Sequence, residues 1–275
     1  RWRGVNKMKG QDKLVNQIKS LIENNKMPHS ILLIGPEGCG KKTLCREITE
    51  EMHLELFEID DKIDAEFIAK TREKQAFVLY SINSSSQDIK AQNLLLKLLE
   101  EPCKNVFIIL RATSTLNLLN TIQNRCIQFN FSGYAKDILR NFITTNNSAS
   151  QLLLEISNTP GDIMKMQNMP LSDMYELADK MFNKMHGANY ANSLSILNRI
   201  AFKNEQNLFD PGVFLRVLCY YLRESCIANR SYSFTKLLTI LNDFIQNSLK
   251  PNINRRYLWE ASITKLWGCL NDREY

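Results

Sequence analysis

Four apolar residues, Ile31 to Ile34, run directly into the glycine-rich segment Gly35-Pro-Glu-Gly-Cys-Gly40, and a helix-forming segment follows. This order constrains the fold more than any other part of the sequence. Glycines let the backbone curl until several N–H groups point inward, and the N-terminus of the next helix adds a partial positive charge. Gly35, Gly40 and Lys41 match the G-x-x-x-x-G-K pattern of a phosphate-binding loop (P-loop). The order of the parts favours a phosphate site over an ordinary strand-to-helix turn.

One part of this loop is displaced. The pattern requires a Ser or Thr after the lysine, whose hydroxyl holds Mg²⁺, but here Lys42 follows and Thr43 comes one position late. The residues predicted to hold phosphates are Gly35, Gly38, Gly40, Lys41 and Thr43, with Lys42 adding positive charge. Two interpretations stay open. Either the loop binds ATP or ADP without a well-placed metal, or it persists because it packs the helix against the sheet.

Length and composition exclude several classes of protein. The chain has 275 residues, 44% of them hydrophobic, which is enough for one large core or two to three smaller ones. No apolar run approaches the roughly 20 residues that span a bilayer, and no signal peptide opens the sequence, so we expect a soluble cytoplasmic protein with no membrane partner.

The seven cysteines form no C-x-x-C pair, which predicts reduced thiols, no zinc and no other metal site. A net charge of +6 fits a nucleic-acid partner without establishing one.

The first half of the chain alternates between strand and helix patterns. Amphipathic or helix-forming segments are expected at 11–25, 41–52, 64–72, 88–101 and 116–124, and strands at 31–34, 54–59, 76–82, 105–111 and 127–131. Strands that alternate with helices predict an α/β fold, a parallel sheet with helices on both faces.

From Ser132 onward the strand pattern disappears. Short helices are expected between residues 134 and 168, separated by a Thr159-Pro-Gly-Asp162 turn, and longer periodic runs at 213–226, 234–249 and 257–270. The change of period predicts three domains: a P-loop domain at 1–131, a small helical domain at 132–170 and an all-helical domain at 171–275.

Three blocks of the sequence resemble the clamp-loader branch of AAA+ proteins. They are the segment from His29 to Leu44, the stretch Gln92-Asn-Leu-Leu-Leu-Lys-Leu-Leu-Glu-Glu-Pro102, and Thr121-Ile-Gln-Asn-Arg-Cys126. Their order and spacing are most similar to the bacterial DNA polymerase III delta-prime family over roughly the first 130 residues. The resemblance implies an AAA+ domain, a helical lid at 132–170 and a helical collar at 171–275. It also implies a hetero-oligomeric ring with other clamp-loader subunits, a sliding clamp and primed DNA as partners, and a place at the replisome in the nucleoid.

The resemblance assigns roles to two further residues. Arg125 stands where the family's S-R-C motif carries an arginine finger, which stabilises charge on the γ-phosphoryl in a neighbouring subunit's ATP site, and Asn124 replaces the Ser of that motif. A structural salt bridge at a strand entrance is the alternative for Arg125. Thr113 corresponds to the sensor 1 residue of the family's nucleotide site.

The resemblance also shows where this chain departs from working ATPases. The strand that should end in a Walker B Asp and Glu reads Tyr80-Ser-Ile-Asn-Ser-Ser-Ser86, and the first carboxylate is Asp88. Gly161-Asp-Ile-Met164 puts Met where the sensor 2 Arg is expected, with Lys165 next to it. We therefore expect no independent ATP hydrolysis. The alternative is an active P-loop ATPase, either a clamp-loader motor or another AAA+ protein such as a helicase loader, that uses Thr43.

Overall fold

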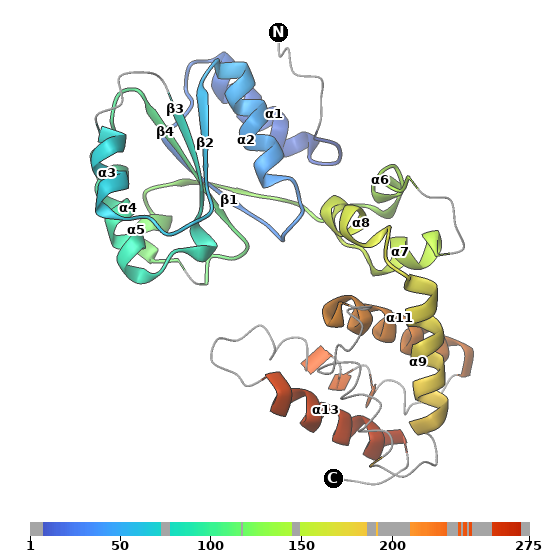
Figure 1. The fold of residues 1–275 in the computed structure, drawn as a ribbon. Helices are drawn as coiled ribbons and strands as arrows, with labels where there is room; N and C mark the ends of the chain where they lie inside the picture. The colour runs from blue at the N-terminus through green and yellow to red at the C-terminus, as the bar shows by residue number, and fades with distance from the viewer. Residues whose placement is uncertain are drawn as a thin grey trace. The chain divides into compact units, whose positions relative to one another are not determined.

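The computed structural model describes residues 8–72, 78–116, 118–144, 149–185, 191, 210–229, 236–237, 239–240, 242–243 and 255–270 (Figure 1). The chain divides into two compact units, Arg1–Phe142 with Asn158–Asp162, and Ile143–Ser157 with Ile163–Tyr275. Among the described residues, no helix combines the length and the apolar character that a membrane crossing requires. The boundaries expected at residues 131 and 170 remain predictions.

The first unit is built on a five-stranded parallel sheet in the order β2-β3-β4-β1-β5. The strands are β1 (Ser30–Ile34), β2 (Glu55–Ile59), β3 (Val78–Asn83), β4 (Val106–Ala112) and β5 (Ile127–Asn130). The helices are α1 (Asp12–Glu23), α2 (Lys41–Met52), α3 (Ala65–Arg72), α4 (Ile89–Glu100), α5 (Asn120–Gln123) and α6 (Lys136–Arg140), with the 3₁₀ turn η1 at Ser84–Ser86. The α/β fold expected from the sequence is confirmed.

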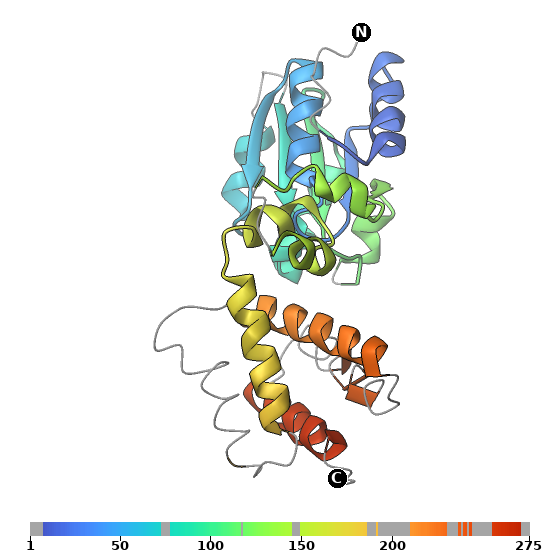
Figure 2. The same cartoon turned by 90° about the vertical axis from the view of Figure 1, so that its right-hand side faces the viewer.

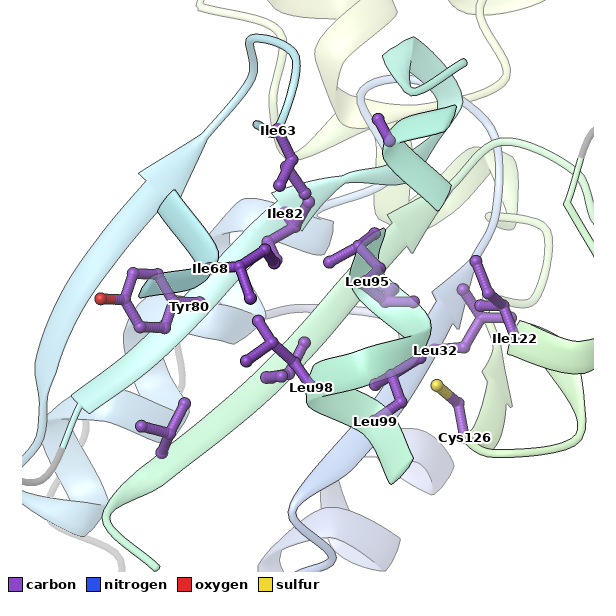
Figure 3. Packing of buried hydrophobic residues seen from close by; sticks show 14 of the residues in the cluster. Leu32, Ile63, Ile68, Tyr80, Ile82, Leu95, Leu98, Leu99, Ile122 and Cys126 are labelled. Atoms are coloured by element: carbon purple, nitrogen blue, oxygen red, sulfur yellow. The ribbon is translucent and has the colours of Figure 1, made fainter. Parts of the chain in front are cut away.

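The two faces of this sheet bury two separate cores. Residues at alternate positions of each strand point to opposite faces, so that Leu79 of β3 packs with α1 and α2 while Tyr80 packs with α3 and α4. On the second face α4 contributes Leu95, which is fully buried (Figure 3). Because both faces are covered by helices, the central strands read as continuous apolar runs.

One helix is shorter than its sequence pattern predicts. The segment expected to be helical at 116–124 forms a helix only at Asn120–Gln123. Before it, the chain turns: the N–H of Leu118 donates to the carbonyl of Thr115, and the side-chain amide of Gln123 donates to the carbonyls of Thr115 and Leu118. Side-chain bonds of this kind compete with helical backbone bonds.

The Thr159-Pro-Gly-Asp162 segment, expected to be a turn between helices, begins a helix instead. α8 runs from Pro160 to Met166. The hydroxyl of Thr159 accepts from the N–H of Asp162 at 3.1 Å, and the carboxylate of Asp162 accepts from the N–H of Thr159 at 3.2 Å. This is a reciprocal capping box, and Pro160 occupies the first helical position, where a missing N–H is harmless.

The second unit is helical in its described parts. It holds α7 (Ser150–Ile156), most of α8, α9 (Leu171–Met185), α11 (Pro211–Asn229) and α13 (Arg255–Leu270). α9 and α11 lie side by side (Figure 2), and the hydroxyl of Tyr221 donates to the carboxylate of Asp179 at 2.9 Å between them. The helix expected at 234–249 falls largely outside the described residues.

Candidate nucleotide site and arginine finger

The glycine-rich loop joins the end of β1 to the start of α2, and its geometry requires glycine at three positions. Gly38 and Gly40 have φ angles of 73° and 101°, in the left-handed region that side chains disfavour. A Cβ on Gly35 would lie 2.7 Å from the Cβ of Phe131. The loop is therefore a specifically shaped backbone turn at the N-terminus of a 12-residue helix.

Two neighbouring segments hold this loop within the first unit. On one side the N–H of Gly161 donates to the carbonyl of Gly38 at 3.0 Å, and the two backbones are so close that a Cβ on Gly161 would lie 2.4 Å from the Cα of Gly38. On the other side the hydroxyl of Tyr134 donates to the carbonyl of Cys39 at 2.7 Å. Burial raises the pKa of Tyr134 to about 12, so this hydroxyl keeps its proton.

Lys41 folds back onto its own loop. Its ammonium group donates to the carbonyls of Gly35 and Pro36, the latter at 2.8 Å. Burial lowers the pKa of Lys41, and the guanidinium of Arg111 lowers it further. A phosphate at the loop would have to replace the two carbonyls as the partner of this ammonium, and would favour its charged form.

Lys42 points toward the neighbouring strand β2. Its ammonium lies 2.6 Å from a carboxylate oxygen of Asp60 and 3.4 Å from one of Glu58. Arg46, one turn further along α2, lies 2.7 Å from the other oxygen of Glu58. The position where a P-loop ATPase carries a metal-binding hydroxyl is thus occupied by a cation, and Thr43 is half-buried one position later.

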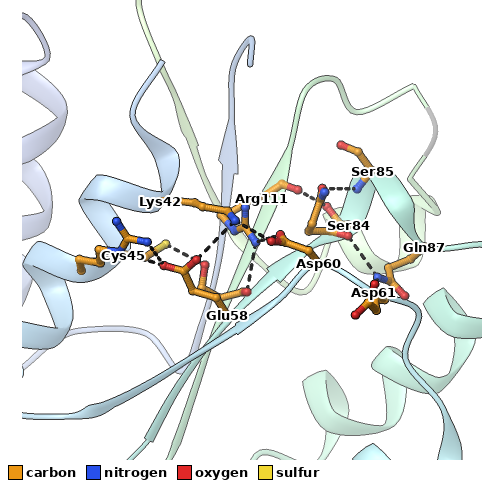
Figure 4. Close-up of polar contacts among 12 residues, drawn as sticks. Lys42, Cys45, Glu58, Asp60, Asp61, Ser84, Ser85, Gln87 and Arg111 are labelled. Atoms are coloured by element: carbon orange, nitrogen blue, oxygen red, sulfur yellow. Dashed lines mark hydrogen bonds and ion pairs between the residues drawn. The ribbon is translucent and has the colours of Figure 1, made fainter. Parts of the chain in front are cut away.

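Arg111 belongs to this site although no sequence motif points to it. It lies near the end of β4, paired in register with Leu33 of β1, and its side chain is only 5% exposed. One nitrogen, Nη2, donates to Asp60 at 2.8 Å and to the carbonyl of Ser81 at 3.3 Å (Figure 4). Its Nε is buried and has no hydrogen-bond partner among the described residues. The signal available in the sequence was a single charge inside the apolar strand 106–112.

The end of β3 is tied to β4 by hydroxyl groups. Ser84, buried, donates to the carbonyl of Arg111 at 2.9 Å, and Asn83 accepts from the N–H of Ser85 at 3.3 Å. The N–H of Thr113, the expected sensor 1 residue, donates to the hydroxyl of Ser85 at 3.1 Å. These bonds fix the segment after β3 to the end of β4.

The residues present do not fit the magnesium ion of a P-loop ATPase. Such a site uses the loop's Ser or Thr hydroxyl and a Walker B carboxylate, and this chain has Lys42 and the segment 81–87 instead. Asp88, the first carboxylate after β3, caps α4 by accepting from the N–H of Ala91 at 2.9 Å and pairs with Lys62 at 2.9 Å. That backbone bond, together with Lys62, lowers the pKa of Asp88.

Arg125 lies at the end of the strands opposite the P-loop, just before β5. Its guanidinium is 2.6 Å from a carboxylate oxygen of Glu100 and donates to the carbonyl of Thr121 at 3.0 Å. Its backbone carbonyl accepts from the hydroxyl of Ser30, the first residue of β1, at 2.8 Å. The backbone is therefore fixed to the sheet while the guanidinium is held by a surface ion pair, of a kind worth roughly 0.2–1 kcal/mol.

The residues expected to replace sensor 2 lie in the second unit. Met164 is exposed, and the ammonium of Lys165 pairs with the carboxylate of Asp210 at 2.7 Å. The cation next to the sensor 2 position is therefore engaged in an ion pair within its own unit.

The glycine-rich loop on a five-stranded parallel sheet defines an AAA+ type P-loop fold. A solved structure with this fold, a point mutant of RuvB from Thermotoga maritima, superimposes with a TM-score of 0.52 and 16% identity, over 92% of this chain and 88% of that one. The family model described as "DNA polymerase III, delta subunit" matches residues 56–135, from β2 to just beyond β5.

Curated relatives agree with the family model. DNA polymerase III subunit gamma of Buchnera aphidicola is 27% identical over 179 residues, covering 52% of this chain and 49% of that protein. DNA polymerase III subunit tau of Bacillus subtilis is 22% identical over 278 residues, covering 78% of this chain and 48% of that one. This chain thus spans about half the length of the curated relatives it matches. By these matches it is similar to AAA+ clamp-loader subunits.

Proposed function

We propose that this chain is a non-hydrolysing clamp-loader subunit of the delta-prime type. In this role it assembles with ATPase subunits into a hetero-oligomeric ring that places a sliding clamp on primed DNA during replication, and it donates Arg125 to a neighbour's ATP site. One contrast carries the proposal: β3 ends without a carboxylate, while Arg125 is present and exposed at the opposite end of the strands.

The geometry of the sheet supports action of Arg125 on a neighbour. The P-loop follows the last residue of β1, whereas Arg125 is bonded to the first, Ser30. Four steps along a strand of about 3.3 Å each separate these ends by roughly 13 Å. An arginine finger must reach within hydrogen-bond distance of the γ-phosphoryl, so this separation favours the action of Arg125 on a site other than its own.

The end of β3 supports the absence of independent hydrolysis. Hydrolysis requires a group that orients or deprotonates the attacking water, and neutral amide and hydroxyl groups at 83–86 do not accept a proton at neutral pH. Ser84 is already committed to the carbonyl of Arg111. The proposed role therefore depends on a partner that carries the catalytic carboxylate.

The test uses this chain mixed with the clamp-loader ATPase subunits of the same source, a sliding clamp and primed DNA. We expect Arg125→Ala to assemble normally but to lower the DNA-stimulated ATPase rate by roughly a hundredfold or more, because arginine fingers contribute about 10³–10⁵ in related phosphoryl transfers. Arg140→Ala is the matched control, since Arg140 is also exposed and paired only loosely, at 3.8 Å, with Asp137.

Gel filtration of each mixture shows whether the chain has joined the complex, so that a failure to assemble is distinguished from a failure to stimulate ATP hydrolysis. An Arg125→Ala chain that assembles and gives the wild-type ATPase rate would contradict the finger and leave Arg125 a structural ion pair. A wild-type chain that joins no complex with the ATPase subunits would contradict the clamp-loader role itself.

A further inference from the structure

Arg111 presents a buried hydrogen-bond donor that the protein does not satisfy. Its Nε has no partner among the described residues, and the side chain is only 5% exposed. Buried polar groups in folded proteins are satisfied in more than about nine cases in ten, so an orphan donor on a guanidinium requires an explanation. An anion bound from outside would provide the missing partner.

The position of Arg111 links it to the phosphate loop. It pairs in register with Leu33, two residues before Gly35, on the face of the sheet that α2 covers. Burial lowers the pKa of Lys41 in the loop, and the charge of Arg111 lowers that pKa by a smaller amount. Through Asp60, Arg111 is also joined to Lys42, because the two oxygens of that carboxylate bind the two cations at 2.8 and 2.6 Å.

Positively charged side chains outnumber negatively charged ones around Arg111. Lys42, Arg46 and Arg111 meet two carboxylates, Glu58 and Asp60. The loop itself adds one cation, Lys41, and one exposed carboxylate, Glu37. A net positive cluster therefore lies at the end of the sheet where a P-loop ATPase places its metal ion.

We propose that this loop binds the phosphates of a nucleoside di- or triphosphate without a divalent cation, and that Arg111 and Lys42 supply the positive charge that magnesium supplies in P-loop ATPases. The carboxylate of Asp60 pairs with both Lys42 and Arg111 and holds these two cations beside the loop. The inference goes beyond the proposed function, which does not require this loop to bind a nucleotide, so either can fail while the other stands.

The physical reason is that the two positions that hold Mg²⁺ in a P-loop ATPase, the residue after the loop lysine and the end of β3, carry no metal ligand here. Mg²⁺ requires oxygen ligands in octahedral geometry, and the site offers an ammonium and a guanidinium in their place. Charged donors form strong, short bonds with phosphate oxygens, and a guanidinium offers several N–H groups at once. A bound phosphate would also release the ammonium of Lys41 from the carbonyls of Gly35 and Pro36.

Titration calorimetry of the purified chain with ADP and with ATP tests this directly. We expect the Kd measured in excess EDTA to lie within about threefold of the Kd in excess Mg²⁺. Arg111→Met should weaken binding at least tenfold in EDTA, because it removes one charge-assisted contact. Lys70→Met is the matched control, since Lys70 is an exposed cation that pairs with Glu66 on α3 and belongs to none of these contacts, and it should leave the Kd unchanged.

A second variant covers the case in which Arg111→Met does not fold, as judged by thermal unfolding. Lys42→Met changes a side chain that is 42% exposed, and it should also weaken binding in EDTA at least tenfold. Three results would each overturn the inference: no binding of ADP or ATP under either condition, binding that requires Mg²⁺, or an unchanged Kd in the folded variants at positions 111 and 42.

Discussion

At the scale of single residues, Glu100 competes with any outside partner for Arg125. The ion pair of 2.6 Å involves two side chains that are each more than a third exposed, so its contribution is at most about 1 kcal/mol. If Arg125 is a finger, Glu100→Gln should raise the DNA-stimulated ATPase rate of the assembled complex by up to roughly fivefold, the factor that corresponds to this energy.

The control for this prediction is Glu66→Gln, which removes an ion pair of the same 2.6 Å length with Lys70 elsewhere on the surface. Its ATPase rate should equal that of wild type. A rate that falls on Glu100→Gln would show instead that the carboxylate positions Arg125 for its task.

Asp60 gives a pH-dependent contribution to stability. Its hydrogen bonds with Lys42 and then with Arg111 lower its pKa in the folded state, so folding favours the ionised carboxylate. The stability advantage of wild type over Asp60→Asn should therefore be complete at pH 7 and decline as the pH falls below about 4. Because Asp60 is half exposed, the difference at pH 7 should stay below about 1 kcal/mol.

Urea unfolding at pH 7, 5 and 3 measures this difference. The neighbouring Asp61→Asn is the control. Asp61 is exposed and accepts a hydrogen bond from Gln87 through its backbone carbonyl, which the substitution leaves in place. A wild-type advantage over Asp60→Asn that is constant across the three pH values would contradict the assignment.

At the scale of elements, the P-loop depends on a contact with the first turn of α8. A Cβ on Gly161 would meet the backbone of Gly38 at 2.4 Å, and backbone atoms cannot give way as a flexible side chain can. Gly161→Ala should therefore lower the free energy of unfolding by about 1–3 kcal/mol, the usual range for overpacking, despite alanine's better helix propensity.

Thermal and urea unfolding of Gly133→Ala provide the comparison. A Cβ at position 133 meets nothing within 4 Å, so this variant should match wild type or be slightly more stable. Equal free energies of unfolding for the two alanine variants would show that the close contact between Gly161 and Gly38 does not limit stability.

At the scale of the whole molecule, the isolated chain should be catalytically silent. Without a carboxylate at the end of β3, we expect no ATP turnover above background in the presence of Mg²⁺, with or without primed DNA. Lys41→Ala should give the same rate as wild type. Turnover by wild type that disappears in Lys41→Ala would instead identify an active P-loop ATPase, such as a clamp-loader motor or a helicase loader.

Local sequence patterns by themselves determined much of the first unit. The glycines of 35–40, the alternation of strands with helices and the missing carboxylate after β3 were all readable, because each depends on neighbouring residues only. Thr159-Pro-Gly-Asp162 also carries the side chains of a capping box at the N-terminus of α8, although its Pro-Gly pair equally fits the turn expected there.

Tertiary structure alone decided what surrounds the loop. Lys42, Asp60 and Arg111 come from α2, the end of β2 and β4, and only the order of the parallel strands brings their charges together. The close contact of Gly38 with Gly161 likewise joins positions 123 residues apart. Such contacts depend on how distant segments of the chain pack together, and local patterns in a single sequence do not specify which distant residues will meet.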